Sequence, residues 1–349
     1  MSITVKALMK DGPHEKFYVG DLQRRDLRED DVYIDIKAAG ICHSDIHTIR
    51  NEWGEAHFPL TVGHEIAGVV TQVGSKVTRF KVGDRVGVGC LVYGCGSCEF
   101  CESGREQFCN VSRVGTYDSV DIDGTITQGG YSQGIVVNER SVLRLPDNMS
   151  FEDAAPLLCA GITTYSPLSN WNIKPGDKVA VMGLGGLGHM AVQIAAAMGA
   201  EVTVLSRSLR KAELAEKLGA KRTLSTTEEG FFDKYKNEFD FILNTVSANI
   251  DLDAYLRLLR VEGVMCVVAL PSESQKISFG SIIGGNRIIA GSNIGGIPQT
   301  QEMLDFCAKH NLKAMIEKID VDYVDEAYER VVSGDVMFRF VIDTSTFEK

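Results

Sequence analysis

The stretch KVAVMGLGGLGHMAVQIAAAMGAEVTVLSRS, residues 178–208, decides the fold of the chain's second half. Its pattern predicts a strand, a glycine turn, an alanine-rich helix and a second strand. The turn carries G-x-G-x-x-G, in which the first glycine permits the tight turn, the second admits a pyrophosphate and the third lets helix pack on strand. The stretch therefore predicts a dinucleotide site. The turn residues that we expect to contact the cofactor are Gly183, Gly185, Gly186, Leu187 and Gly188.

The end of the second strand predicts which dinucleotide is bound. NAD enzymes usually carry Asp or Glu there, which binds the ribose 2′-hydroxyl. This chain has Glu201 at the start of the strand instead, and its exit carries Ser206, Arg207 and Ser208, with Lys211 one turn on. Hydroxyls and cations accept a 2′-phosphate that a carboxylate would repel, so we expect NADP(H). The alternative is an ordinary solvated basic patch at a helix start.

The sequence around this stretch predicts two kinds of architecture. Buried-strand candidates near 239–246, 264–270 and 287–296 alternate with helical segments, which is typical of a doubly wound parallel sheet. The first part of the chain reads instead as short Val-rich strands separated by glycine turns, as in the alternating segment 30–42, and favours a sandwich or partial barrel. A helical pattern follows at 151–168, with Ser150 as its expected N-cap. Two further helices and a closing strand end the chain.

Six of the nine cysteines fall into two groups of different character. The segment GCGSCEFCESGREQFC, residues 94–109, spaces four cysteines as C-x2-C-x2-C-x7-C within one short loop. A closed set of four thiolates is typical of structural zinc. Disulfides or an iron–sulfur cluster are the alternatives, but the ferredoxin run ends C-x3-C-P, and the final gap here is seven. The four expected ligands are Cys95, Cys98, Cys101 and Cys109.

The second group is scattered along the chain. Cys42, His64 and Cys159 form a Cys-His-Cys set with an open fourth position, which is typical of catalytic zinc. Taken alone, three such distant residues carry little weight. The other cysteines, Cys90, Cys266 and Cys307, have no ligand-like neighbours in the sequence, and we expect them to pack as small hydrophobic residues.

Composition narrows the functional class. The chain has 349 residues, enough for two domains, and its 44% hydrophobic and 24% charged residues are typical of a soluble globular protein. The net charge of −11 disfavours nucleic acid and anionic membranes as partners, and no apolar run is long enough to span a bilayer. An odd number of cysteines and a polar beginning, MSITVKALMKDGPHEKF, favour the reducing cytoplasm.

Five motifs together extend the analysis through family resemblance. GICHSDIH, FPLTVGHEIAGVV, the four-cysteine loop, PLLCAGITTYSPL and GLGGLGH resemble, in order and spacing, the zinc-containing medium-chain alcohol dehydrogenases. They look most like the cinnamyl-alcohol-dehydrogenase branch and its bacterial aldehyde-reductase members. The resemblance covers essentially the whole chain. It implies a β-rich GroES-like catalytic domain formed by residues 1–154 and 296–349, with a Rossmann domain inserted at 155–295.

The resemblance also implies roles for individual residues. Cys42, His64 and Cys159 would hold the catalytic zinc, with Glu65 as a neighbouring or transient ligand and Asp45 as an orienting group. Ser44 and His47 match the proton-relay positions. The remaining expected cofactor contacts are Thr163, Ser292, Asn293 and Ile294 beside the nicotinamide half, and Arg339 at a phosphate. Many relatives have a basic residue where Met337 stands, so no charged role is carried over to that position.

The chemistry agrees with an NADP(H)-dependent zinc enzyme that interconverts primary alcohols and aldehydes. Zinc polarises the oxygen, nicotinamide exchanges hydride, and a hydroxyl and an imidazole can carry the proton. Trp53, Phe58 and Ile294 are candidate pocket walls. The rival readings are an NAD-dependent polyol or secondary-alcohol dehydrogenase, a non-catalytic zinc scaffold, and a zinc-free quinone reductase. From the resemblance we expect a homodimer that pairs sheet edges near residues 287–295.

Overall fold

The computed structural model describes residues 3–271 and 273–348, and these fall into two compact units. One unit comprises residues 1–162 and 295–349, and the other comprises residues 163–294. The expected boundary at residue 155 lies shortly before this division, because residues 155–162 pack with the first unit. Among the described residues, no helix has the length and apolar character needed to cross a membrane.

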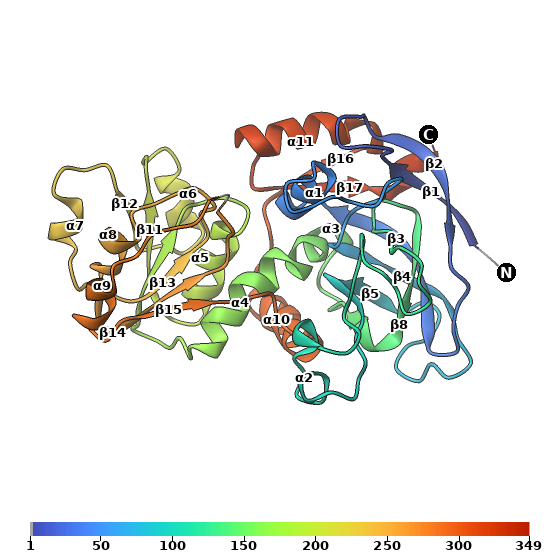
Figure 1. The fold of residues 1–349 in the computed structure, drawn as a ribbon, viewed down its shortest axis with the longest axis horizontal. Helices are drawn as coiled ribbons and strands as arrows, with labels where there is room; N and C mark the ends of the chain where they lie inside the picture. The colour runs from blue at the N-terminus through green and yellow to red at the C-terminus, as the bar shows by residue number, and fades with distance from the viewer. Residues whose placement is uncertain (1–2, 272, 349) are drawn as a thin grey trace. The chain divides into compact units, whose positions relative to one another are not determined.

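The first unit is built on a seven-stranded sheet (Figure 1). Its central strand β3 (Asp31–Gly40) is the alternating segment expected from the sequence, and Val32, Ile34 and Ile36 on one face are buried. It pairs antiparallel with strands on both sides, and the C-terminal strand lies next to it. The other strands are β4 (Ile66–Val73), β5 (Arg85–Val88), β8 (Gly134–Asn138), β9 (Leu143–Arg144), β16 (Ile316–Ile319) and β17 (Arg339–Asp343).

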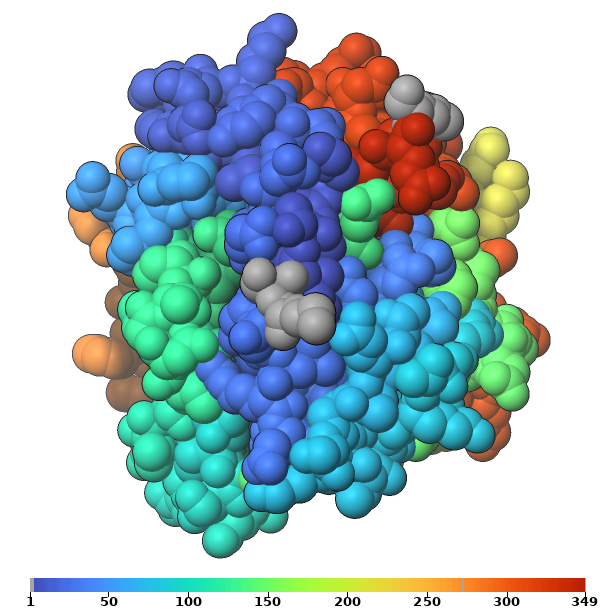
Figure 2. Space-filling view, turned by 90° about the vertical axis from the view of Figure 1, so that its right-hand side faces the viewer, coloured from blue at the N-terminus to red at the C-terminus, as the bar shows by residue number. Residues whose placement is uncertain are grey.

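Two small sheets and several helices complete this unit. The hairpin of β1 (Ile3–Met9) and β2 (Tyr18–Arg24) packs through its own small core, and Figure 2 shows the N-terminal segment, in dark blue, on the outer surface. β6 (Leu91–Tyr93) pairs with β7 (Val114–Gly115). The helices are α1 (His43–Ile49), α2 (Glu99–Glu102), α3 (Phe151–Ala154), α10 (Ile297–His310) and α11 (Val324–Ser333).

The helical pattern predicted for residues 151–168 is interrupted in the structure. Ser150 caps α3 as expected, accepting a hydrogen bond from the Asp153 N–H at 3.0 Å. A 3-10 turn (Ala155–Leu158) follows, and α4 (Ala160–Asn170) begins only after Cys159. Pro156 has no N–H for a continuous helix, which accounts for the tighter turn. The break leaves Cys159 between two helical pieces.

The second unit has the parallel doubly wound sheet that the glycine stretch predicts. Its strand order β12-β11-β10-β13-β14-β15 is the order of the Rossmann fold. The helical segment expected between the strand candidates 239–246 and 264–270 is the short α8, and β14 already begins at Leu259, before the expected strand. The strands are β10 (Lys178–Met182), β11 (Glu201–Ser206), β12 (Arg222–Ser225), β13 (Phe239–Asn244), β14 (Leu259–Val267) and β15 (Ile288–Gly291). The helices are α5 (Gly188–Ala197), α6 (Ala212–Lys217), α7 (Phe231–Lys234), α8 (Leu252–Leu256) and α9 (Phe279–Ile283).

Candidate active site

Four buried side chains of the first unit converge on one point. The ligand-type atoms of Cys42, His64, Glu65 and Cys159 all lie within 4.8 Å of one another, and the Sγ atoms of the two cysteines are 3.8 Å apart. Cys42 precedes α1, His64 and Glu65 precede β4, and Cys159 stands at the helical break. Gly40 leaves room for this set, because a Cβ there would lie 2.1 Å from the Glu65 Oε2 atom.

The donor atoms of this cluster fit a zinc ion. His64 Nε2 and Glu65 Oε2 are buried without a hydrogen-bond partner among the described residues, which is costly for polar atoms unless a ligand satisfies them. Two thiols and an imidazole are the donors that catalytic zinc takes, with a fourth position left open. The structure thus brings together the three ligands predicted from the sequence, and Glu65 with them. Their assignment to a zinc ion stays a prediction.

Asp45 holds the imidazole in the orientation that a metal requires. Its Oδ1 lies 3.2 Å from His64 Nδ1, and its Oδ2 accepts hydrogen bonds from the Cys42 N–H at 2.9 Å and the Tyr131 hydroxyl at 2.8 Å. A carboxylate at Nδ1 favours the tautomer whose Nε2 carries a free lone pair, as is common behind metal-binding histidines. These contacts agree with the orienting role expected for Asp45. Tyr131 was not anticipated, since it lies far away in the sequence.

The side chains of this cluster shift one another's pKa values. The hydrogen bond between Cys42 and Cys159 holds the pKa of Cys42 well below its usual value and raises that of Cys159. Burial opposes a charge on His64, but neighbouring Cys90, Asp45 and Cys42 raise its pKa well above the usual value. Because zinc binds thiolate and neutral imidazole, metal binding here would release protons.

Glu65 and Arg339 form a buried ion pair behind the cluster. Arg339 Nη1 donates to Glu65 Oε1 at 3.0 Å and to the Ile41 carbonyl at 3.2 Å. Burial raises the pKa of Glu65 well above its usual value, and Arg339 opposes that shift. The contact observed for Arg339 is therefore with a carboxylate, and the expected phosphate contact stays a prediction.

Cys90 corrects one interpretation of the sequence. It was expected to pack as a small hydrophobic residue, but a hydrogen bond with Cys159 lowers its pKa, and its charge raises that of His64. Cys90 lies between β5 and β6, and no neighbour in the sequence marks it as a metal ligand. Its interaction with Cys159 therefore depends on the fold. Cys266 and Cys307 are buried as expected, and burial raises their pKa values to about 11 and about 12.

The predicted proton-relay residues lie on α1 beside the cluster. Ser44 Oγ is 3.6 Å from Cys42 Sγ. The His47 ring stacks on Trp53 with centroids 4.6 Å apart, and the centroid of the His43 ring lies 4.9 Å from that of His47. His47 Nδ1 contacts the Glu52 carboxylate, a partner that sequence analysis did not identify. Trp53 is half exposed, and its observed contact is with His47.

The four-cysteine loop forms a second candidate metal centre. All four thiols lie within 4.8 Å of one another, and Cys95 Sγ is 3.8 Å from Cys101 Sγ. Backbone N–H groups of Ser97 and Cys98 donate to Cys95 Sγ at 3.4 and 3.3 Å. These hydrogen bonds lower the pKa of Cys95 to about 6, whereas burial raises that of Cys101 to about 12. Amide donors around four thiols suit a closed thiolate set, so the loop fits structural zinc.

The glycine turn of the second unit has the geometry that the sequence predicts. Gly183 has a φ of +83°, and a Cβ on Gly188 would lie 2.2 Å from the Gly183 carbonyl. Nothing lies within 4 Å of a Cβ built on Gly185, so the backbone there is open to a ligand. Gly186 and Leu187 complete the turn, and α5 begins at Gly188. The first and third glycines are thus required by the fold, and the second leaves space for phosphate.

The expected 2′-phosphate contacts lie at the carboxyl end of β11. The strand ends at Ser206, whose Oγ accepts a hydrogen bond from the Ser208 N–H at 3.3 Å, and Arg207 is exposed. Lys211 Nζ lies 3.5 Å from the Leu184 carbonyl, which brings it to the glycine turn. Glu201 sits at the opposite end of the strand and pairs with Lys221 at 2.9 Å, as its sequence position suggested.

The other expected cofactor contacts are more dispersed. Thr163 is buried in α4, and Ser292, Asn293 and Ile294 directly follow β15. Ile294 has a φ of +41°, an unusual value for a β-branched residue. In the sequence, these residues stand at the two ends of the segment that forms the second unit. Their contacts with the nicotinamide half of the cofactor stay predictions.

Two protein-family models match this chain. Residues 28–147 match the profile described as "Alcohol dehydrogenase GroES-like domain", and residues 186–309 match "Zinc-binding dehydrogenase". The chain is 58% identical over 331 residues to a probable formaldehyde dehydrogenase of Bacillus subtilis, covering 95% of each chain. It is 55% identical over 344 residues to an NADP-dependent alcohol dehydrogenase of Mycolicibacterium smegmatis, covering 98% of this chain and 99% of the relative.

Solved structures agree with these sequence relationships. A cinnamyl alcohol dehydrogenase from Sorghum bicolor superposes with a TM-score of 0.95 at 41% identity, over 98% of each chain. A cinnamyl alcohol dehydrogenase from Helicobacter pylori, complexed with NADP(H), superposes with a TM-score of 0.93 at 44% identity, over 99% of each chain. Both similarities extend over both units of the fold.

Proposed function

The chain belongs to the zinc-binding alcohol dehydrogenase family, and we propose that it transfers hydride reversibly between NADP(H) and primary alcohols or their aldehydes. The observation that carries the proposal is the buried set of Cys42, His64 and Cys159, whose imidazole Nε2 has no other partner among the described residues. The relatives named NADP-dependent alcohol dehydrogenases support the reaction class and the cofactor.

The metal and the cofactor supply the reactive groups. Cys42, His64 and Cys159 would hold a zinc ion, which would act as a Lewis acid that polarises the substrate oxygen. NADP(H), on the glycine turn and the basic exit of β11, supplies or accepts the hydride. The chain's own residues orient these groups. Asp45 fixes the His64 tautomer through the 3.2 Å contact at Nδ1, and the hydroxyl of Tyr131 fixes Asp45 in turn.

The proton path runs along α1. Ser44 is next to the thiol cluster, and its hydroxyl can pass a proton because it both donates and accepts. His47 carries the proton outward, since imidazole exchanges protons near neutral pH. The Glu52 carboxylate at Nδ1 and the stacked Trp53 ring hold the imidazole in one orientation. Glu52 is thus a positioning residue for the relay.

One experiment tests the reaction class and its direction. A panel of aromatic and aliphatic aldehydes, together with mannitol and secondary alcohols, is assayed with both cofactors. The proposal predicts the highest kcat/KM for an aldehyde with NADPH. The polyol is included because a mannitol dehydrogenase of Petroselinum crispum is 48% identical over 324 residues. A preference for mannitol with NAD would overturn the proposal in favour of the polyol alternative.

A second experiment tests the proton path. His47→Gln should lower turnover while zinc content stays constant, and added imidazole should restore part of it. Glu52→Gln should give a smaller loss with the same rescue, because the imidazole is present but less well oriented. Unchanged turnover in His47→Gln across pH 6–9 would remove His47 from the mechanism, unless product release limits the rate, which a pre-steady-state burst would reveal.

The chain's quaternary state is part of the proposal. β15 ends the sheet of the second unit, and within the described residues no strand pairs with its outer edge. Phe279 and Ile283, on the helix before β15, are each 74% exposed, which is unusual for large apolar side chains. A homodimer that pairs the β15 edges would cover this surface, and light scattering of the wild type and of Phe279→Lys tests it.

The free thiols support a cytoplasmic location.

A further inference from the structure

A hairpin of the first unit reaches from the protein surface to the candidate metal ligand. We call residues 114–128 the Tyr117 hairpin. Its two arms are joined by backbone hydrogen bonds, from the Asp118 N–H to the Thr127 carbonyl at 2.9 Å and from the Thr127 N–H to the Ser119 carbonyl at 2.8 Å. Farther along, the Asp121 N–H donates to the Thr125 carbonyl at 2.8 Å. These hydrogen bonds link the two arms along the length of the hairpin.

The inner end of this hairpin contacts His64 directly. The Tyr117 ring stacks on the His64 ring with centroids 5.5 Å apart and an interplanar angle of 27°. Thr116 beside it donates through Oγ1 to the Gly89 carbonyl at 2.5 Å and through its N–H to the Cys90 carbonyl at 3.2 Å. The Tyr117 hydroxyl interacts with Thr48 and Asp45, and burial raises its pKa well above the usual value. Tyr117 thus covers the imidazole face, while Asp45 holds Nδ1 at its edge.

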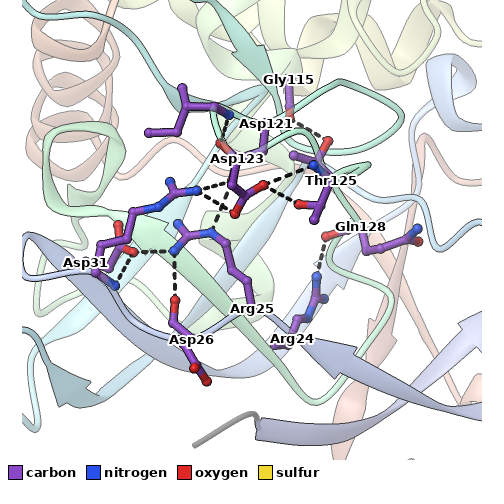
Figure 3. Close-up of polar contacts among 12 residues, drawn as sticks. Arg24, Arg25, Asp26, Asp31, Gly115, Asp121, Asp123, Thr125 and Gln128 are labelled. Carbon is purple, nitrogen blue, oxygen red and sulfur yellow. Dashed lines mark hydrogen bonds and ion pairs between the residues drawn. The ribbon is translucent and has the colours of Figure 1, made fainter.

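The outer end of the hairpin is held by ion pairs (Figure 3). Asp121 lies 3.1 Å from Arg25 Nε and 3.0 Å from Arg28 Nη2, and Asp123 lies 2.8 Å from the same Arg28 atom. Fully buried Asp31 pairs with Arg25 and accepts a hydrogen bond from the Arg28 N–H at 2.8 Å. Arg25 directly follows β2 and Arg28 lies in the segment between β2 and β3, so these pairs tie the hairpin to that connection.

Apolar packing contributes little to the position of this outer end. A cavity of about 270 Å³ separates the hairpin from β2, β6 and β8, and its wall includes Arg25, Asp121 and Thr127. The apolar residues at the tip, Val120 and Ile122, are 58% and 50% exposed. Val114 and the Tyr117 ring pack against the hydrophobic core at the inner end of the hairpin, so the ion pairs are the contacts that hold its outer end.

We propose that Tyr117 is a positioning residue for His64, and that the ion pairs of Arg25 and Arg28 with Asp121 and Asp123 hold it in place. The imidazole is then confined by a carboxylate at its edge and a ring on its face, so Nε2 stays directed at the two thiols. Such outer contacts tune how tightly a metal is retained. The inference rests on the proposed role of His64 as a zinc ligand.

The test compares two substitutions at one position. Tyr117→Phe keeps the ring, whereas Tyr117→Leu removes the stacking partner. Zinc release from the purified two-zinc enzyme is followed with a colorimetric chelator. Tyr117→Leu should release one of the two zinc ions about tenfold faster, whereas Tyr117→Phe, which loses only the hydroxyl interactions with Thr48 and Asp45, should release it at a rate between those of Tyr117→Leu and the wild type. The release rate of the second zinc, held by the four-cysteine loop, should be the same in all three proteins.

The ion pairs are tested through non-additivity. Arg28→Gln should speed release of the same zinc about twofold to fivefold, and should add little in the Tyr117→Leu background, because the ring it positions is already gone. The matched control is Lys76→Gln, which removes an exposed ion pair at 2.6 Å with Glu29, the neighbour of Arg28, and leaves the pairs with the hairpin intact. It should leave both release rates unchanged.

The outcomes separate this inference from the proposed function. Two zinc ions with equal release from Tyr117→Leu and wild type would overturn the inference alone. A wild-type protein holding only the loop zinc would overturn the metal site itself. If Tyr117→Leu does not fold, Arg28→Gln decides, and a rate equal to that of Lys76→Gln would overturn the inference.

Discussion

Discrimination between NADPH and NADH should depend on one exposed arginine. Arg207 is the first residue after β11, and among the described residues no carboxylate pairs with its guanidinium. Its charge is therefore available to a 2′-phosphate. A hydrogen bond to a charged group contributes roughly 1.5–3 kcal/mol. Exposure and salt screening favour the lower end for this side chain, which corresponds to about tenfold in affinity.

The basic exit of β11 offers a second contact of the same kind. Lys211 lies at the glycine turn, 3.5 Å from the Leu184 carbonyl. Two contacts of about 1.5 kcal/mol each give a preference for NADPH of about 100-fold in kcat/KM. The loss should appear mainly in KM, because the adenosine end is remote from the hydride and contributes mostly uniform binding.

Steady-state kinetics with both cofactors measures this directly. Arg207→Gln should lower kcat/KM for NADPH about tenfold and leave that for NADH unchanged. Arg210→Gln, an equally exposed arginine on the same segment, is the matched control and should change neither value more than about twofold. Ser206→Asp should repel the phosphate and reverse the preference. Equal losses for both cofactors in Arg207→Gln, or equal use of both by the wild type, would refute the reasoning.

Four further substitutions, one of them checked by a compensating change, test the metal centres and the elements around them. Cys159→Ala should lose one zinc and nearly all activity while staying folded, whereas Cys98→Ser should lose the other zinc and lower the melting temperature; elemental analysis finding fewer than two zinc ions in the wild type contradicts this. Glu106→Gln should lower the free energy of unfolding by about 1 kcal/mol, because the Glu106 carboxylate accepts a hydrogen bond from the first N–H of α10 at 2.9 Å. An unchanged midpoint of chemical denaturation would show that this cap does not stabilise the protein. Arg339→Met should lower the free energy of unfolding by about 3–5 kcal/mol, because it leaves Glu65 buried without its partner. Adding Glu65→Gln to this variant should restore the lost stability, and chemical denaturation of both variants checks this.

Local sequence patterns predicted the parts of the fold whose causes are local. The glycine turn follows from steric demands within a few residues, so Gly183 and Gly188 adopt the expected conformations. The alternation in β3 identified a half-buried strand for the same reason. The helical pattern at 151–168 was wrong in its continuity, because Pro156 and the packing around Cys159 divide it. Periodicity reports which side chains face the core but not where the backbone must bend.

The residues that sequence analysis missed act through contacts made by the fold. Cys90 reaches Cys159 across 69 positions of the chain, and Tyr131 reaches Asp45 across 86. Neither has a spacing that marks it, since each reads as an ordinary core residue beside a strand. Glu52 is closer to His47, but a carboxylate on a helix-ending turn is commonly only a solvated charge. Such partners can be identified only once the sheet has brought their segments together.

The ligands of the candidate catalytic centre share a structural position that explains why periodicity does not reveal them. Cys42 is the N-cap of α1, His64 follows Gly63 with its φ of +107°, and Cys159 occupies the break before α4. A side chain inside a helix or strand points where its neighbours on that face point, so three such residues from different elements would rarely meet at one atom. Each donor here is released from that constraint by the end of its element. The fold can therefore aim each donor separately, and contacts from Asp45 and Tyr117 take over the positioning that regular structure no longer supplies.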